Sequence, residues 1–221
     1  MKDVLILSVT YNIPNEIQKR FNKCIELSKP KCSYDIQFIS SSKRMKSNVF
    51  NKSILLNDAL KEFIKNKNYK VLIQADIDLI VPSEIIDKSL EIASQERTCF
   101  YNYHRRIDQK DLPDLPDDYL KMNLDKYLKD FVPESASGCW NAMSRESWLT
   151  SGGYNEYMEF WGKEDDYFRK TARIIGNINF INYNRFCLIH VNHDSRQKDN
   201  RKYNKLMEYK LEREGLKNWL I

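Results

Sequence analysis

The first hundred residues alternate between short apolar runs and amphipathic stretches, and this alternation restricts the fold more than any other feature. The run Asp3–Val9 is almost continuously apolar, as expected for a strand buried on both faces of a sheet. Further strands are predicted at Tyr34–Ser40 and Val71–Ala75, and helices at Asn15–Ser28, Asn51–Lys65 and Glu84–Ser94. This order predicts an α/β fold in which helices cover a parallel sheet.

The second half of the chain has a weaker pattern. Residues Tyr103–Pro133 are rich in Asp, Lys and Pro, and they predict an irregular insertion with a short helix at Tyr119–Leu128. The elements expected beyond it are a turn at Ser135–Gly138, a helix from about Ser144, a break at Gly152 and Gly153, a helix at Asp165–Ile175, strands at Asn177–Tyr183 and Phe186–Val191, and a charged helix from Arg196. A chain of 221 residues suits one domain.

Charge and cysteine content exclude several classes of protein. The chain has 36 Lys and Arg against 31 Asp and Glu, but the two signs are mixed along the sequence. We therefore expect no nucleic-acid partner, and the net charge of +5 suits anionic small molecules. The five cysteines form no C-x-x-C pair, and neither a membrane-spanning run nor a signal peptide is recognised. These features predict a cytoplasmic protein with reduced thiols.

An acidic pair follows the third predicted strand. Asp76 and Asp78 are two residues apart, so at a strand end their side chains point to the same side. Ligands of α/β sheets bind at the carboxyl ends of strands, and two carboxylates there favour a hard metal ion. In the simpler alternative, one Asp caps the next helix and the other is solvated.

Two of the three histidines, His190 and His193, follow an apolar run with the spacing H-x-x-H. Imidazoles three residues apart can converge on one metal ion, which can also accept carboxylate oxygens. A histidine pair by itself is more often a surface feature. Together with Asp78 it becomes a candidate metal site.

A third candidate region is the segment Trp161-Gly162-Lys163-Glu164-Asp165-Asp166. Three carboxylates at a helix start can be explained by the helix dipole alone. An indole beside them could instead form a platform for a sugar, and a partly buried carboxylate could act as a general base toward a sugar hydroxyl.

Taken in order, these motifs resemble the metal-dependent GT-A glycosyltransferases, most closely the β-1,4-galactosyltransferase family and related family-2-like transferases. The matching segments are Val9–Asn12 (a nucleotide-binding turn), Phe50–Asn57 (F-N-R-A-K-L-L-N in the family), Asp76–Pro82 (D-V-D-L-I-P, with Val81 inserted), Gly152–Tyr154, and Trp161–Asp166 (W-G-G-E-D-D). The resemblance covers nearly the whole chain.

The resemblance implies a single GT-A domain over 1–221, with a central, mostly parallel sheet. A nucleotide-binding half would span 1–102, a variable insertion 103–134, and an acceptor and metal half 135–221. It implies an enzyme that moves a hexose or N-acetylhexosamine from a UDP-sugar to a carbohydrate hydroxyl with inversion. The acceptor would be a glycan or a glycolipid, and a glycolipid would bring the protein into peripheral contact with a membrane.

The resemblance also assigns roles to individual residues. Those expected at the nucleotide are Thr10, Tyr11, Asn12, Lys52 and Asp76. Those expected to hold Mn²⁺ (or Mg²⁺) are Asp78, His190 and His193. Asp165 would be the catalytic base, and the residues expected to orient the acceptor are Trp161, Glu164 and Asp166.

The sequence departs from the family pattern at several positions. Lys52 stands in place of an Arg, Lys163 in place of a Gly, and His190 where many members have Met. Ala136 occupies the position of an aromatic residue in galactose-using members, so we expect room for an acetamido group on the donor. Three alternatives stay open: a retaining GT-A transferase, a metal-dependent nucleotidyltransferase, and a non-catalytic sugar-binding module.

Overall fold

The computed structural model describes residues 2–11, 13–40, 50–65, 68–102, 104–108, 138–159, 162–182, 188–192, 202–205, 215 and 219–220. The predicted short helix at Tyr119–Leu128 lies outside these residues, as does most of the predicted helix from Arg196.

The described helices are α1 (Asn15–Ser28), α2 (Lys52–Lys65), α3 (Ser83–Ala93), α4 (Arg145–Ser151) and α5 (Glu164–Ile175). The strands are β1 (Val4–Thr10), β2 (Tyr34–Ser40), β3 (Val71–Ala75), β4 (Leu79–Ile80), β5 (Thr98–Tyr101), β6 (His104–Asp108), β7 (Trp140–Ser144), β8 (Asn179–Asn182) and β9 (Leu188–Asn192). The predicted bounds of α1, β2 and β3 are confirmed; those of α2 and α5 differ by one residue at the start, and those of α3 by one residue at both ends. None of the described helices combines the length and apolarity needed to cross a bilayer.

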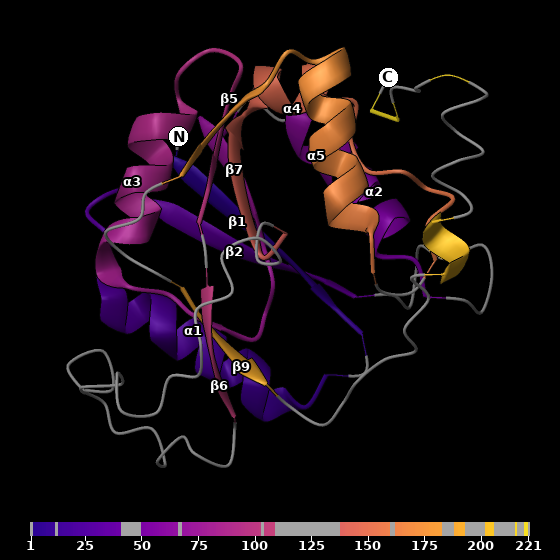
Figure 1. The fold of residues 1–221 in the computed structure, drawn as a ribbon. Coiled ribbons are helices and arrows are strands. Elements are labelled where there is room, and N and C mark those ends of the chain that lie inside the picture. Colours follow the sequence, from indigo (N-terminus) through magenta and orange to yellow (C-terminus); the bar gives the residue numbers. More distant parts are fainter. Residues whose placement is uncertain are drawn as a thin grey trace.

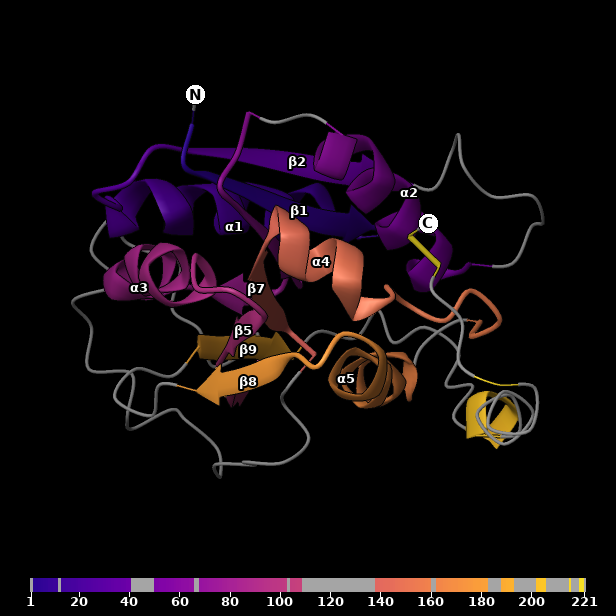
Figure 2. The ribbon, with the colours of Figure 1, turned by 90° about the horizontal axis from the view of Figure 1, so that it is seen from above.

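The main sheet has the strand order β2-β1-β3-β7-β5-β8 (Figures 1 and 2). Strand β1 runs parallel to β2 and β3, and β5 runs parallel to β8, whereas β7 is antiparallel to both of its neighbours. The mostly parallel sheet is therefore confirmed, with one reversed strand inside it. Because of this reversal, Ala75 at the end of β3 pairs with Trp140 at the start of β7.

A second, three-stranded sheet has the order β4-β9-β6. It pairs Leu79 with His190 on one side and Arg106 with His190 on the other. Strand β6 lies within the segment Tyr103–Pro133, so the prediction of an irregular insertion is wrong at this point. Its sequence HRRID has no apolar pattern, and its pairing with β9 defines the strand. Strands β5 and β7 were also absent from the prediction.

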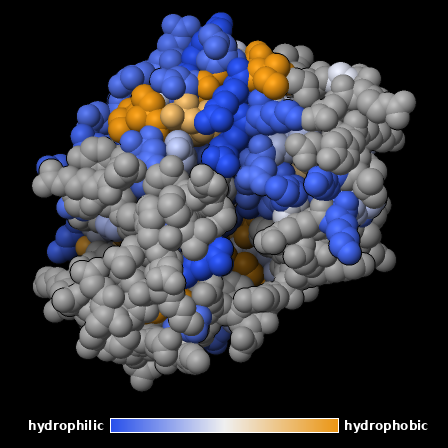
Figure 3. Space-filling view, in the orientation of Figure 1, coloured by the Kyte–Doolittle hydropathy of each residue, from blue (hydrophilic) through white to orange (hydrophobic). Residues whose placement is uncertain are grey.

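Helices cover both faces of the main sheet, as the view in Figure 2 shows. Alternate residues of β1 point to opposite faces, as the pleat requires. Val4 and Ile6 belong to a buried cluster with residues of α1 and α3, whereas Leu5 and Leu7 belong to a cluster with residues of α2, α4 and α5. Hydrophilic residues cover most of the described surface in Figure 3, and hydrophobic ones show only in small groups.

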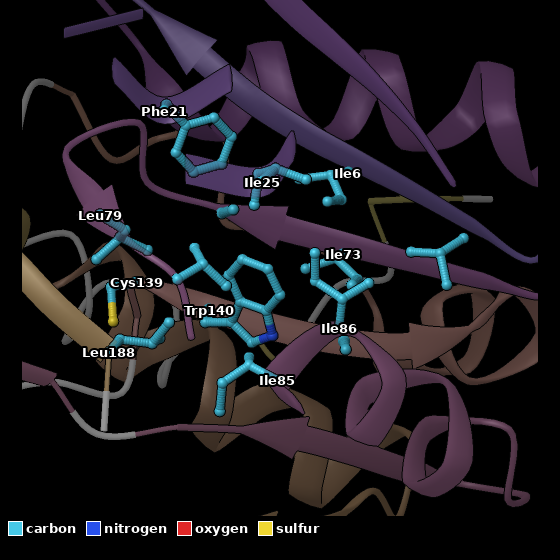
Figure 4. Packing of buried hydrophobic residues seen from close by; sticks show 14 of the residues in the cluster. Ile6, Phe21, Ile25, Ile73, Leu79, Ile85, Ile86, Cys139, Trp140 and Leu188 are labelled. Carbon is cyan, nitrogen blue, oxygen red and sulfur yellow. The ribbon is translucent and has the colours of Figure 1, made fainter. Parts of the chain in front are cut away.

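The first of these clusters centres on Trp140 (Figure 4). Its indole is fully buried, and Nε1 donates a hydrogen bond to Ser89 Oγ at 3.0 Å. At the edge of the same cluster, Leu79, Cys139 and Leu188 lie together (Figure 4). Trp140 thus packs α3 onto the sheet, and the neighbouring residues join the small sheet to the large one.

We expect Trp140→Ala to lower the free energy of unfolding by about 3–5 kcal/mol, because it leaves a large cavity in this cluster. Urea unfolding followed by circular dichroism measures the effect. Tyr203→Ala, at a side chain 37% exposed, is the control and should change stability by less than about 0.5 kcal/mol. Equal effects of the two substitutions would contradict the central role of Trp140.

Candidate active site

Four elements meet at the carboxyl end of β3. Asp76 follows that strand directly, and its N–H donates to the carbonyl oxygen of Cys139 at 2.8 Å. The antiparallel pairing of β3 with β7 therefore places the residues before Trp140 beside the acidic pair. The first residues of α2 and α5 complete the site, because Lys52 and Asp165 reach the same point.

A buried ammonium lies at the centre of this site. Lys52 Nζ is 3.1 Å from Asp76 Oδ1, 3.5 Å from Asp165 Oδ2 and 3.7 Å from Glu164 Oε1. The ammonium has three donors and no acceptor, which suits a group surrounded by carboxylates. The family resemblance assigned Lys52 and Asp76 to the nucleotide and Asp165 as the catalytic base, and the structure places all three in one ion-pair cluster.

Burial and mutual repulsion shift the ionisation of this cluster. Burial raises the pKa of Asp165; Lys52 opposes this effect, Glu164 and Asp76 add to it, and the result lies well above the ordinary range. Burial also raises the pKa of Asp76. Burial alone would lower the pKa of Lys52, but the carboxylates raise it well above its usual value. The ammonium therefore stays charged, and Asp165 has a stronger affinity for a proton than an ordinary Asp.

A network of buried polar side chains inside the sheet contacts Asp76 through a hydrogen bond. Gln74 Nε2 donates to Asp76 Oδ1 at 3.3 Å, and Gln74 Oε1 accepts from Asn141 Nδ2 at 2.9 Å and from the Tyr154 hydroxyl at 3.2 Å. These three residues are fully or almost fully buried. Satisfied networks of this kind fix side-chain orientation, so Asp76 has a defined position.

Asp165 lies directly against the backbone of Gly138. A Cβ atom built on Gly138 would approach Asp165 Cγ and Oδ2 to 2.1 Å, a distance that no side chain tolerates. Within the described part of the chain, Asp165 Oδ1 is buried and has no hydrogen-bond partner. This oxygen therefore has acceptor capacity that no described donor uses.

The other residues expected at the acceptor have different surroundings. Glu164 is buried, and its Oε2 accepts a hydrogen bond from the Gly162 N–H at 2.7 Å, so it holds the loop that leads into α5. Asp166 is exposed and pairs with Lys163 and Arg169 at 3.0 and 3.3 Å. Trp161 lies outside the described residues.

The backbone conformation at Lys163 suits the glycine that the family pattern has at this position. It lies immediately before α5 with φ of 74°, in the left-handed region that favours glycine. The turn is therefore kept in this chain although a lysine forms it.

Asp78 lies two residues beyond Asp76 and contacts His190. The distance between Asp78 Oδ2 and His190 Nε2 is 3.0 Å, and both side chains are largely buried. Burial lowers the pKa of His190, but Asp78 and Asp76 raise it above its ordinary value on balance. The pairing of β4 with β9 brings the two residues together, and Asp78 O accepts from the Val191 N–H at 2.8 Å.

This pair fits a divalent metal ion. Adjacent ligand atoms around an octahedral ion, with bonds of about 2.1 Å, lie about 3 Å apart, as the Asp78 and His190 atoms do. A carboxylate oxygen and an imidazole nitrogen are both accepted by Mn²⁺-type ions. His193, the third predicted ligand, lies outside the described residues, and among the described ones no group of three His, Cys, Asp or Glu is arranged for a metal.

Two of the residues expected at the nucleotide, Thr10 and Tyr11, lie at the end of β1. The Tyr11 ring stacks on Phe50 with centroids 4.3 Å apart, and Thr10 Oγ1 donates to the Ile39 carbonyl at 3.3 Å. Asn12 lies outside the described residues, as does Ala136. Because β1 is the parallel neighbour of β3, Tyr11 and Asp76 follow strands whose ends meet at one edge of the sheet.

Sequence reasoning missed His104 and the supporting role of Gln74. The His104 and His190 rings lie 5.0 Å apart, and His104 Nδ1 is 3.3 Å from Cys139 Sγ. The available signal for His104 was that the chain has only three histidines. A glutamine inside the apolar run Val71–Ala75 was the signal for Gln74.

The architecture is that of the GT-A glycosyltransferases, so the predicted fold class is confirmed. No known family model and no curated protein matches the chain. Among solved structures, the catalytic domain of Drosophila β1,4-galactosyltransferase 7 in complex with xylobiose matches with a TM-score of 0.62 and 15% identity, over 92% of this chain and 79% of that one.

Two further structures match similarly. A mutant of the Drosophila enzyme in complex with manganese, UDP-Gal and xylobiose has a TM-score of 0.60 and 14% identity, over 91% of this chain and 79% of that one. S. aureus TarS in complex with UDP-GlcNAc has a TM-score of 0.60 and 10% identity, over 94% of this chain and 65% of that one. At these identities the likeness establishes the fold.

The raised pKa of Asp165 gives a prediction for stability. Between the ordinary Asp value, near 4, and the higher value in the folded protein, the folded state binds more protons than the unfolded state, so stability falls as pH rises. We expect Asp165→Asn to be more stable than the wild type at pH 8, and the difference to shrink as pH falls toward 4.

Thermal unfolding across this pH range measures the difference. Asp166→Asn removes an exposed charge from the same turn of α5 and is the matched control. A loss of stability at pH 8 in both variants would mean that Asp165 acts only through the helix dipole.

Proposed function

We propose that this protein is a metal-dependent glycosyltransferase that moves a hexose or N-acetylhexosamine from a UDP-sugar to a carbohydrate hydroxyl with inversion. The observation that carries the proposal is that Asp165 lies close to the end of β3, which Asp76 and Asp78 follow. A base and a metal ion at these positions would serve one reaction centre. Support comes from the neighbouring structures, which hold UDP-Gal with manganese, UDP-GlcNAc, and xylobiose. They offer no support for the expected membrane contact.

On the donor side, the half-buried ring of Tyr11, which stacks on the fully buried Phe50, would offer a flat surface near the end of β1 for the uridine. Thr10 and Asn12 would line the same site, and Asp76 would bind a donor hydroxyl. Asp78 and His190, with His193, would hold Mn²⁺ or Mg²⁺. When bound, the ion supplies Lewis-acid stabilisation of the charge on the leaving UDP.

On the acceptor side, Asp165 would take the proton of the attacking hydroxyl. Its raised pKa brings its proton affinity closer to that of a general base that works near neutral pH. Gly138 keeps the carboxylate in place from one side and Lys52 from another. A base positioned opposite the leaving group leads to attack on the far face of the sugar, and hence to inversion.

The direct test is incubation of the purified protein with a panel of sugar nucleotides, Mn²⁺ and oligosaccharide acceptors. UDP release and a product of inverted anomeric configuration by NMR are expected. Pyrophosphate release would indicate a nucleotidyltransferase, a retained configuration a retaining enzyme, and binding without turnover a sugar-binding module. Equal use of acetamido and plain hexose donors would agree with the small Ala136.

The metal assignment predicts that excess EDTA abolishes UDP release and that Mn²⁺ restores it. Asp78→Ala should weaken Mn²⁺-dependent UDP binding by at least about tenfold, because it removes a charged ligand. Asp87→Ala removes a carboxylate on α3, away from the site, and is the control. Full activity in EDTA would exclude the metal role.

The base assignment predicts that Asp165→Asn lowers kcat by about 10²–10⁴-fold and leaves UDP affinity nearly unchanged. Gly138→Ala should lower kcat in the same way, because the added methyl group displaces the Asp165 carboxylate. Steady-state kinetics and calorimetry with UDP separate the two effects. If Asp165→Asn kept more than about a tenth of the activity, the base would lie elsewhere.

A further inference from the structure

The ammonium of Lys52 lies on the protein side of the carboxylates with which it pairs. The Lys52 side chain is 2% exposed, whereas those of Asp76 and Asp165 are 24% and 23% exposed. A ligand that enters from solvent therefore meets the carboxylates before it can reach the ammonium.

We propose that Lys52 is a positioning residue, which holds Asp76 and Asp165 at one buried ammonium, and that it does not bind the donor phosphates. This inference rests on the proposed function. It differs from the role that the family resemblance implies for this position, where an arginine contributes to the nucleotide site.

The backbone of Lys52 is itself anchored. It is the first residue of α2, and the preceding Asn51 accepts a hydrogen bond from the Ile54 N–H at 3.0 Å. The Asn51 amide also donates to the Glu156 carbonyl at 2.8 Å, which ties the start of α2 to the segment that leads toward α5. The ammonium thus projects from a fixed point into the cluster.

The two carboxylates need this cation in order to stay close. Asp76 belongs to the end of β3 and Asp165 to the start of α5, and Lys52 Nζ lies within 3.5 Å of an oxygen of each. Like charges brought together in a buried site repel strongly. A compact ammonium with three donors can contact Asp76, Asp165 and Glu164 together, whereas a planar guanidinium favours a bidentate contact with one carboxylate.

The test compares Lys52→Met, which removes the charge, with Lys52→Arg, which keeps it. Lys88→Met is the control, because Lys88 pairs with Glu91 on the outer face of α3. The measurements are the Kd for UDP in the presence of Mn²⁺, by calorimetry, and kcat at saturating donor.

If Lys52 positions the carboxylates, Lys52→Met lowers kcat by about 10²-fold, as a displaced catalytic group does, and raises the Kd for UDP by no more than about threefold, the part that depends on the position of Asp76. Lys52→Arg then recovers part of kcat, and Lys88→Met matches the wild type. A Kd for UDP raised tenfold or more in Lys52→Met, with kcat retained, would overturn the proposal and return Lys52 to the nucleotide site.

Lys52→Met leaves carboxylates without their cation and can fail to fold, so a second measurement uses Lys52→Met/Asp165→Asn, which removes one charge of each sign. Melting temperatures of the wild type, the two single variants and the double variant form a cycle. We expect Asp165→Asn to raise the melting temperature more in the Lys52→Met background than in the wild type.

Additive shifts in that cycle would overturn the proposal. The cycle needs no sugar transfer, so its result is independent of the proposed function. If the wild type transfers no sugar, the proposed function fails, and the melting temperatures still decide whether Lys52 holds Asp165.

Discussion

The site depends on the antiparallel pairing of β7 with β3. Strands β1, β2 and β3 all run in one direction, so their carboxyl ends meet at one edge of the sheet. The reversed β7 brings its first residue to that same edge, and Trp140 pairs with Ala75. Were β7 parallel to β3, Gly138 would lie at the opposite edge, and Asp165 would lose the backbone surface against which it packs.

This arrangement places charged groups inside the protein. The Lys52 ammonium is surrounded by carboxylates. The adjoining part of the main sheet contains the buried polar chain of Gln74, Asn141 and Tyr154 in place of apolar side chains. Each member of that chain has a hydrogen-bond partner, so the desolvation of the amides and the hydroxyl is largely compensated. Burial raises the pKa of the Asp165 carboxyl and Lys52 limits the rise, a combination that a fully solvated site would not provide.

The sequence was sufficient where one local pattern decides the structure. Helix α1 and strands β2 and β3 have a clear period and turn residues at both ends, so their bounds could be predicted. Strand β6 could not, because HRRID is polar and becomes a strand only through its pairing with β9. The same division holds for the site: the D-x-D and H-x-x-H spacings pointed to Asp78 and His190, and family likeness pointed to Asp165 as the base.

The sharing of Lys52 between Asp76 and Asp165 depends on a contact between Lys52 and Asp165, which are 113 residues apart, and no spacing rule reveals it. Gly138 is a similar case, since only the three-dimensional contact with Asp165 shows why a side chain is excluded there.

The small sheet has a consequence for how the protein is made. Strand β9 supplies the partner of both β4 and β6, and it emerges from the ribosome more than 80 residues after β6. His190 lies 112 residues after Asp78. At about 5–20 residues per second, the ribosome therefore adds His190 roughly 6–22 s after Asp78. During that interval the small sheet lacks its middle strand. The contact between Asp78 and His190 therefore forms late in folding, because it cannot precede the synthesis of β9.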